Sequence, residues 1–313
     1  MKVFIAGASG AIGRRLVPLL HACGYDVVAM TRTPAKAGML KALGAQPVVA
    51  DGLDRAAVID AMLRAEPDVV IHEMTGLSGI TDFKRYDETL AATNRLRTEG
   101  TDILLEAARA GGARRFIAQS FGLWRYVNGT GDESDPLDTH VSPTMASSVA
   151  AIHHLESDVV AASGIVLRYG FLYGPGTGFS HGGSLVGAVR ARAFPLIGDG
   201  SGVWSFVHVD DAAAATATAV ERGRAGIYNV VDDDPAPIAE WLPELADAVG
   251  ARPPRRLPLW LGRLAAGDGV YMHTRTTGLR NAKARRELGW RPQYASWREG
   301  FRDGLGAPSL AAA

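Results

Sequence analysis

Residues 7–13 read Gly7-Ala8-Ser9-Gly10-Ala11-Ile12-Gly13, and this stretch decides the fold. It follows an apolar run at residues 3–6 and precedes a helix-like segment at residues 14–20. Between a strand and a helix, one glycine permits the tight turn, one lets a pyrophosphate approach the backbone, and one lets helix and strand pack closely. The N–H groups at the start of the helix then face the phosphates. We therefore predict that a dinucleotide binds at Gly7, Ser9, Gly10, Ala11, Ile12 and Gly13; the alternative is a plain strand–helix turn without a ligand.

The composition restricts the class of protein. The chain has 313 residues, and 33 Lys and Arg balance 33 Asp and Glu, so that neither nucleic acid nor an anionic membrane is an expected partner. Cys23 is the only cysteine, which excludes an intrachain disulfide and agrees with the cytoplasmic location that we expect. The eight histidines lack a metal-binding spacing, and no apolar stretch reaches membrane-spanning length. We expect no targeting leader and no metal site.

Apolar runs alternate with helical patterns through the first two-thirds of the chain. Six candidate strands lie at residues 3–6, 27–30, 47–49, 69–72, 116–118 and 165–167. The helical patterns include residues 56–64, with Asp54 as a candidate cap, one long helix at residues 89–110, and another at residues 147–162. Strongly apolar strands that alternate with helices predict a doubly wound parallel α/β sheet, the Rossmann type, covered on both faces.

The pattern changes after residue 170, where glycine-rich loops and shorter elements begin. We predict a Rossmann domain at residues 1–170, to which residues 205–231 return. Residues 171–204 and 232–305 should form a smaller C-terminal substrate lobe, and residues 306–313 a disordered tail. Ligands of open α/β sheets bind at the carboxyl edge of the strands, which such a lobe would cover.

The end of the second strand indicates which dinucleotide binds. An acidic residue there holds the ribose of NAD, whereas a basic residue accepts the 2′-phosphate of NADP. This chain has Thr31 and Arg32 at that point, with Lys36 one turn later and no carboxylate. The residues favour NADP(H) over NAD(H), although Arg32 that merely stacks on adenine is the alternative. Asp51-Gly52 follows the third strand, where the carboxylate either accepts a hydrogen bond from the adenine amino group or caps a helix.

These motifs together resemble the extended short-chain dehydrogenase/reductase superfamily, of the NAD(P)-dependent epimerase/dehydratase type, over about residues 2–305. The matching pieces are the glycine stretch, Asp51-Gly52, Asn94, and residues 115–120, 167–176, 206–211 and 288–292. The resemblance implies NAD(P) at the glycine loop. It also implies that Met74, Thr75, Asn94 and Ser120 lie close to the cofactor. Members often pair through two helices, so a homodimer is an expected assembly.

The chain departs from this superfamily at its catalytic dyad. A Tyr, followed four residues later by a Lys, normally moves the proton. Alignment on Glu156 puts Ser148 and Ile152 at those two positions, and neither side chain has the required acidity or charge. No Lys occurs between residues 84 and 283 and no Tyr between residues 126 and 169, so no shift in register restores the dyad.

Three other residues are candidates for the missing acid or base. Ser120 ends the fifth strand, Tyr126 follows in the next loop, and His153 lies on the helix that normally carries the dyad. The alternatives are a plain cofactor contact for Ser120, packing for Tyr126 and a surface position for His153; a water is a further possible donor. We expect the substrate pocket to be lined by Trp124, Tyr126, Tyr173, His181 and Trp204.

The sequence thus favours an NADP(H)-binding oxidoreductase that transfers a hydride to or from a small organic carbonyl or alcohol, with a proton donor other than Tyr–Lys. A non-catalytic NADP(H)-binding redox sensor is one alternative, because it would need no dyad. A sugar-nucleotide epimerase or dehydratase is another, although those reactions use the missing base directly.

Overall fold

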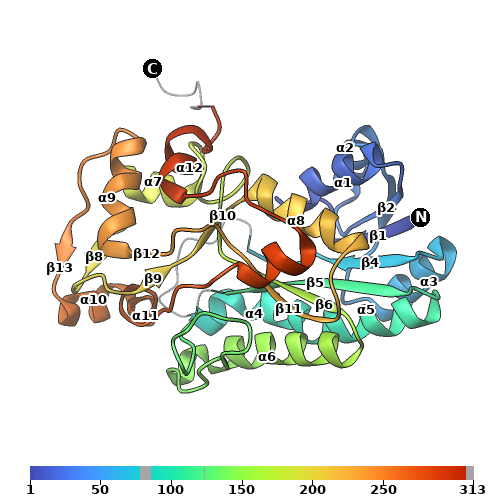
Figure 1. Ribbon diagram of the computed structural model, residues 1–313, viewed down its shortest axis with the longest axis horizontal. Coiled ribbons are helices and arrows are strands. Elements are labelled where there is room, and N and C mark those ends of the chain that lie inside the picture. The colour runs from blue at the N-terminus through green and yellow to red at the C-terminus, as the bar shows by residue number, and fades with distance from the viewer. Residues whose placement is uncertain (78–85, 123, 308–313) are drawn as a thin grey trace.

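A parallel sheet of seven strands forms the centre of the protein. The computed structural model describes residues 1–77, 86–122 and 124–307, and the strand order in its large sheet is β11-β6-β5-β4-β1-β2-β3 (Figure 1). The strands of this sheet are β1 (Lys2–Ala6), β2 (Asp26–Thr31), β3 (Gln46–Val49), β4 (Val69–His72), β5 (Arg115–Phe121), β6 (Ile165–Tyr169) and β11 (Gly226–Val230). The predicted doubly wound α/β fold is therefore confirmed, and all six candidate strands are present.

The sheet has its topological switch point between β1 and β4. From β1 the chain runs outward through β2 and β3, and it then returns to add β4, β5 and β6 on the other side. At the carboxyl end of β1, Ala6 is paired with Met30 of β2 and with His72 of β4. Ligands of doubly wound sheets bind at the carboxyl ends of the two strands where the direction reverses.

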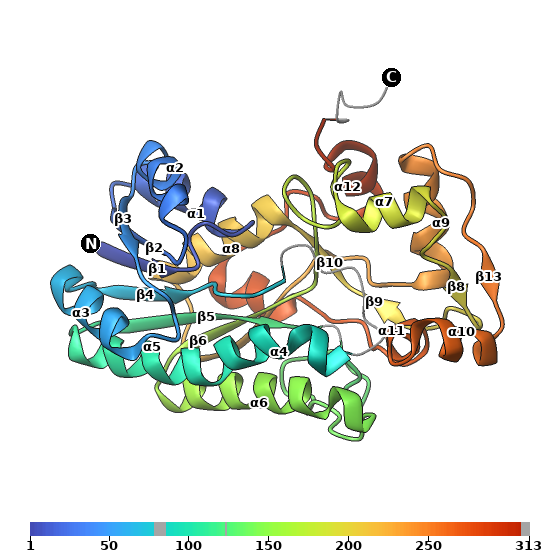
Figure 2. The ribbon, with the colours of Figure 1, turned by 180° about the vertical axis from the view of Figure 1, so that it is seen from behind.

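Helices cover both faces of the sheet, as the two opposite views show (Figures 1 and 2). One face carries α1 (Gly13–Ala22), α2 (Ala37–Ala42) and α8 (Val209–Glu221). The other carries α3 (Arg55–Ala65), α4 (Tyr86–Arg97), α5 (Glu99–Ala110) and α6 (Ala146–Ala161). Asp54 caps α3 as expected, because its carboxylate accepts a hydrogen bond from Ala57 N.

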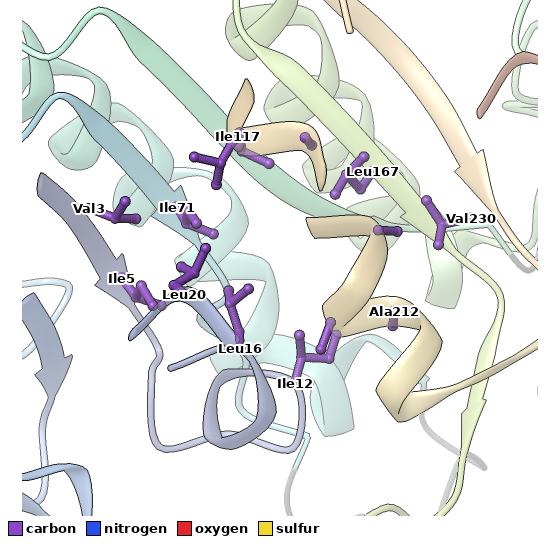
Figure 3. Packing of buried hydrophobic residues seen from close by; sticks show 14 of the residues in the cluster. Val3, Ile5, Ile12, Leu16, Leu20, Ile71, Ile117, Leu167, Ala212 and Val230 are labelled. Carbon is purple, nitrogen blue, oxygen red and sulfur yellow. The ribbon is translucent and has the colours of Figure 1, made fainter. Parts of the chain in front are cut away.

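Apolar side chains fill the space between the sheet and α1 and α8. Figure 3 shows Ile5 and Ile71 of the central strands on the face of the sheet that is covered by Leu16 of α1 and, farther along, by Ala212 of α8. All four are fully buried, and each buried large aliphatic side chain contributes roughly 1.5–3 kcal/mol relative to exposure. This packing fixes α1, and therefore the glycine stretch that precedes it, against the edge of the sheet.

The long helix predicted at residues 89–110 is two helices, α4 and α5. The chain breaks at Thr98, whose backbone angles of φ −96° and ψ −88° are not helical. Its hydroxyl donates a hydrogen bond back to Asn94 O at 3.1 Å. A threonine hydroxyl that bonds to the preceding turn competes with helix geometry, and the apolar periodicity does not reveal this competition.

Outside the large sheet, short strands and helices surround an aromatic core, and this part is called the C-terminal lobe below. Phe206, Trp241 and Phe301 are fully buried in it, with edge-to-face ring contacts at 5.3 Å. Its elements are β7 (Phe171–Tyr173), α7 (Ser184–Arg190), β8 (Leu196–Ile197), β9 (Val203–Trp204), β10 (Phe206–His208), β12 (Ala236–Pro237), α9 (Ile238–Ala248), β13 (Arg256–Leu257), α10 (Leu259–Ala266), α11 (Gly269–Thr274) and α12 (Trp297–Asp303).

Short helical turns occur at Pro34–Lys36, Pro143–Met145 and Ala284–Leu288. Among the described residues, no helix combines the length and the apolar character needed to cross a membrane. Most of the tail that we predict to be disordered, residues 308–313, lies outside the described residues.

Candidate functional site

The glycine stretch forms a turn that excludes side chains at two of its positions. Gly7 has a φ of +92°, and a Cβ there would lie 2.5 Å from the carbonyl carbon of Glu73, which follows β4. A Cβ on Gly13 would lie 2.4 Å from Ala8 O, where α1 begins. Both glycines are therefore required by close backbone contacts, and the turn presents bare backbone at the switch point.

The start of α1 offers free backbone donors. Within the described chain, the N–H groups of Ala11, Ile12 and Gly13 have no hydrogen-bond acceptor. Such unpaired amides at a helix N-terminus, together with the positive end of the helix dipole, bind phosphate groups. The first turn of α1 also contains no acidic side chain that would repel an anion. The turn therefore fits the pyrophosphate of a dinucleotide.

Polar and basic residues gather at the carboxyl end of β2. Ser9 Oγ of the glycine turn lies 3.1 Å from Thr31 Oγ1, which also accepts a hydrogen bond from Thr33 N at 3.3 Å. Arg32 and Lys36 are exposed, and neither has an ion-pair partner in the part of the chain that the structure describes. Two free cations beside the glycine turn suit an additional phosphate group.

The chain after β3 reaches the chain after β4. The Asp51 carboxylate accepts a hydrogen bond from Leu53 N at 3.0 Å, so it stabilises its own turn, while the helix cap is Asp54. A Cβ on Gly52 would lie 2.2 Å from Met74 Sδ. Met74 is buried, and the following Thr75 is half-buried. Two segments predicted separately to contact the cofactor are thus neighbours.

A buried charged network lies at the carboxyl ends of β5 and β6. Ser120 Oγ donates a hydrogen bond to Glu156 Oε1 of α6 at 2.7 Å. Arg168 of β6 binds the same carboxylate through two nitrogens, at 2.7 and 2.6 Å. The Arg168 guanidinium also lies 5.4 Å from the ring centre of Tyr126. The Ser120 hydroxyl is therefore part of a fixed network that joins three elements.

Aromatic side chains stand beside this network. Tyr126 is buried, which raises its pKa well above the ordinary value for tyrosine, and its hydroxyl donates to Gly122 O at 3.3 Å. Trp124 is fully buried and meets Tyr86 and Phe121 edge-on, with ring centres 5.9 and 6.5 Å apart. The structure thus brings Ser120, Trp124 and Tyr126 together near the end of β5.

Helix α6 carries Ser148 and Ile152, the two residues that align in sequence with the dyad. Ser148 is fully buried; its hydroxyl donates to Asp87 Oδ1 at 2.7 Å and accepts from Asn94 Nδ2 at 2.9 Å. Asp87 also accepts hydrogen bonds from the backbone N–H groups of Ser147 and Ser148. The carboxylate therefore caps α6 from α4, and the Ser148 hydroxyl is committed to a structural bond. Ile152 beside it is buried and apolar.

Four predicted site residues lie elsewhere. His153 is on the exposed face of α6, with Nδ1 3.3 Å from Ser157 Oγ. Tyr173 and Trp204 are buried in the core of the C-terminal lobe, and Trp204 donates from Nε1 to Met272 O at 2.9 Å. His181 contacts Arg190, with 3.2 Å between Nδ1 and Nη2. The structure does not bring these four side chains to the Ser120 network.

A buried acid, Glu73, lies at the switch point and belongs to none of the sequence motifs. Glu73 directly follows β4, and its Oε1 lies 2.9 Å from Tyr169 Oη. Burial raises the pKa of Glu73 to about 8, although the hydrogen bond to Tyr169 opposes this rise. The sequence feature that could have indicated Glu73 is its position: it is an acidic residue immediately after an entirely buried strand, at the point where the strand order of the sheet reverses.

Comparison with known proteins identifies the family. The sequence model described as "NAD dependent epimerase/dehydratase family" matches residues 3–231. The chain belongs to the NAD-dependent epimerase/dehydratase family. This epimerase/dehydratase-family protein is 45% identical, over 307 residues, to a 3-diazoavenalumate denitrifying reductase from a Streptomyces species; the match covers 96% of this chain and 99% of the relative.

A second similar reductase is more distant in sequence. It is a 4-hydroxy-2-methyl-3-oxo-4-farnesyl-3,4-dihydroquinoline-1-oxide ketoreductase from Stigmatella aurantiaca, 29% identical over 323 residues, with 93% of this chain and 92% of the relative covered. The named relatives of this epimerase/dehydratase-family protein thus include two reductases.

Solved structures share the fold. UDP-glucose 4-epimerase from Thermus thermophilus, in complex with NAD, has a TM-score of 0.75 at 24% identity, with all of both chains covered. dTDP-glucose 4,6-dehydratase from Streptomyces venezuelae, also with NAD, has a TM-score of 0.76 at 23% identity, with 97% of this chain and 96% of that one covered. This family member therefore has an NAD(P)-binding Rossmann fold.

Proposed function

We propose that this protein is an NADP(H)-dependent reductase whose hydride acceptor needs no protein acid at the reacting atom, and that the acceptor is an aryl diazonium group. The observation that carries the proposal is the chemistry of two side chains on α6, Ser148 and Ile152. The Ser148 hydroxyl is bound between Asp87 and Asn94, and Ile152 is apolar, so this helix offers no dissociable proton where the related dyad would act.

The choice of acceptor follows from charge. A carbonyl that accepts a hydride becomes an alkoxide, whose formation is slow unless an acid donates a proton. An aryl diazonium cation that accepts a hydride at its terminal nitrogen becomes a neutral diazene. Since no negative charge develops on the acceptor, the transfer does not depend on a Tyr–Lys pair.

The proposed reaction balances in atoms and electrons. The hydride brings one hydrogen nucleus and two electrons to the terminal nitrogen, where an N–H bond forms and one N–N π bond breaks. The diazene then loses N₂: its C–N and N–H bonds break, and the hydrogen from nitrogen forms a new C–H bond at the ring carbon. The aryl diazonium ion is reduced to an arene and N₂ while NADPH is oxidised to NADP⁺, and no further oxidant, reductant or proton is required.

The activity for which the Streptomyces relative is named supports this acceptor. The Streptomyces protein is named a denitrifying reductase of a diazo compound, and it shares 45% of its residues with almost the whole of this chain. The Stigmatella relative is named a ketoreductase, which makes an activated ketone the second candidate acceptor. The two candidates differ in whether a proton donor is needed.

The residues of this chain have separate tasks in the proposal. The amides of Ala11, Ile12 and Gly13 bind the pyrophosphate, and Arg32 binds the 2′-phosphate. When bound, the nicotinamide supplies the hydride. The network of Ser120, Glu156 and Arg168 holds the ends of β5 and β6 in a fixed geometry, because orientation of the reactants contributes much of the rate.

An isotope experiment tests the reaction. Purified protein is mixed with an aryl diazonium salt and NADPH that carries deuterium at C4 of the nicotinamide. We expect N₂ release and an arene with deuterium at the carbon that lost nitrogen, faster than in the same mixture without protein. Reduction of ketones alone would move the assignment to the second candidate, and binding of cofactor without turnover of either would favour a sensor.

Cofactor preference is tested at Arg32. We expect Arg32→Ala to weaken NADPH binding by about 1.5–3 kcal/mol, the scale of a hydrogen bond to a charged group, and to leave NADH binding nearly unchanged. Calorimetric titration with both cofactors measures the effect. Arg252→Ala, which removes an exposed arginine from the C-terminal lobe, should change neither affinity. Equal losses of NADPH and NADH binding would contradict the 2′-phosphate assignment.

A further inference from the structure

Glu73 lies directly beneath the glycine turn. Its backbone N–H donates to Ala6 O at 2.7 Å, and a Cβ on Gly7 would touch its carbonyl group. The residue is only 6% exposed, although it stands at the switch point, where a dinucleotide crosses the sheet. A titratable group is therefore buried next to the place where the bound phosphates would carry their negative charge.

The Glu73 side chain ends a row of short polar contacts. Its Oε1 is 2.9 Å from Tyr169 Oη, Tyr169 Oη is 2.6 Å from Thr216 Oγ1, and Thr216 Oγ1 donates to Ala212 O at 2.8 Å. The other carboxyl oxygen of Glu73, Oε2, is fully buried and has no partner in the part of the chain described by the structure.

The number of hydrogens in this row depends on the charge of Glu73. If Glu73 is ionised, only the two hydroxyl hydrogens of Tyr169 and Thr216 are available for the three contacts. One contact would then bring two acceptor oxygens together with no hydrogen between them. With a protonated Glu73, the acid donates to Tyr169, Tyr169 to Thr216, and Thr216 to Ala212 O. Each contact then has one hydrogen, and no buried charge is left without a counter-charge.

Among the described residues, no cation contacts Glu73. Tyr169 of β6 is the titratable group that contacts it, and burial holds the pKa of Tyr169 far above its usual value. On the same face, α1 and α8 carry Arg15 and Asp210, which pair with each other. The adjacent His72 belongs to the other face, where Nε2 lies 3.2 Å from Leu96 O, and burial lowers its pKa to about 4. Neither His72 nor Tyr169 titrates between pH 7 and about 9.

We propose that Glu73 is an uncharged acid beneath the glycine turn and that its ionisation weakens dinucleotide binding. At a pH where Glu73 is partly ionised, binding of the dinucleotide therefore takes up a proton. The inference rests on the proposed function, since it requires that a dinucleotide occupies this turn. A protonated Glu73 carries no charge and does not repel the phosphates. An ionised carboxylate repels them, and the protein interior screens this repulsion only weakly because its dielectric constant is low. By linkage, bound phosphates in turn favour the protonated acid.

The expected pH dependence follows in sign. The pKa of Glu73 is raised to about 8, so the acid is neutral at pH 7 and becomes ionised as the pH rises through 8. Affinity for NADPH should be constant below pH 7 and should fall on the order of tenfold by pH 9.5, the scale of one poorly screened charge. Proton uptake on binding should be greatest near or just above pH 8.

Calorimetric titration with NADPH from pH 6.5 to 9.5, in two buffers of different ionisation enthalpy, measures both affinity and proton uptake. Glu73→Gln keeps a neutral side chain of the same shape. We expect this variant to bind as tightly as the parent at pH 7, to lose the decline above pH 8, and to take up no proton. Glu66→Gln, which changes an exposed acid next to α3, should behave as the parent does.

Infrared spectroscopy reads the protonation of Glu73 without cofactor. A protonated carboxyl band at pH 7, lost above pH 9 and missing in Glu73→Gln, is expected. Parent and Glu73→Gln proteins with the same pH profile and no proton uptake would overturn the inference and leave the proposed function intact. Failure of the parent to bind any nicotinamide dinucleotide at pH 7 would overturn both.

Discussion

Replacement of Arg168 by methionine is expected to lower the free energy of unfolding by about 3–5 kcal/mol, because it leaves the Glu156 carboxylate buried without its counter-charge. The side chains of Arg168 and Glu156 are 5% and 7% exposed, and two hydrogen bonds join them. Without Arg168, the Ser120 hydroxyl is the one side-chain donor to this carboxylate that remains among the described residues. Urea denaturation at pH 7 measures the loss.

Two controls separate the buried charge from lost packing. Arg168→Met combined with Glu156→Leu removes both charges and should recover a large part of the stability, because a buried pair replaced by apolar side chains is often neutral. Arg64→Met breaks an exposed pair with Asp60, and its effect should be much smaller. If Arg168→Met and Arg64→Met were equally mild, the network could not be what fixes β5 to β6.

Gly7→Ala is expected to lower the free energy of unfolding by about 3–5 kcal/mol and to abolish dinucleotide binding. The left-handed backbone at φ +92° disfavours any side chain, and the new methyl group would lie 2.5 Å from the Glu73 carbonyl group and 2.7 Å from Met74 N. These are backbone atoms of the sheet edge, so either the turn or the end of β4 must move. Urea denaturation and NADPH titration measure the two effects.

Gly24 provides the matched control. It also has a positive φ, +80°, but a Cβ there would meet nothing within 4 Å. Gly24→Ala should therefore cost only the backbone term, about 1–2 kcal/mol, and should retain cofactor binding. If both variants lost the same stability and both bound NADPH, close contact between the turn and β4 would not be what the glycine provides.

The inner strands β1, β4 and β6 were predictable because each is a short apolar run between turn residues, and burial on both faces requires such runs. The division of the predicted long helix was not, because the break at Thr98 depends on one hydroxyl that bonds to the preceding turn. Its neighbours keep the helical periodicity on both sides, so the pattern alone is continuous.

The site was predictable where it depends on local backbone geometry. It was less predictable where it depends on contacts between side chains from different elements. The glycine turn can be recognised from seven consecutive residues. The contact between Glu156 and Arg168 joins a helix to a strand, and nothing near either residue in the sequence indicates it. Tyr173 of β7 and Trp204 of β9 were expected to line a pocket and lie in the lobe core, because an aromatic side chain suits a pocket wall and a core equally well.

The last strand of the sheet has a consequence for synthesis of the chain. Gly226 of β11 pairs with Ile165 of β6, so β6 lacks this partner strand until β11 has been synthesised much later. On the ribosome, β6 emerges with one row of N–H and C=O groups unpaired, and an open strand edge recruits other chains. The nascent protein is therefore exposed to aggregation until residue 230 has left the exit tunnel, and a slow or interrupted translation between these two strands prolongs that exposure.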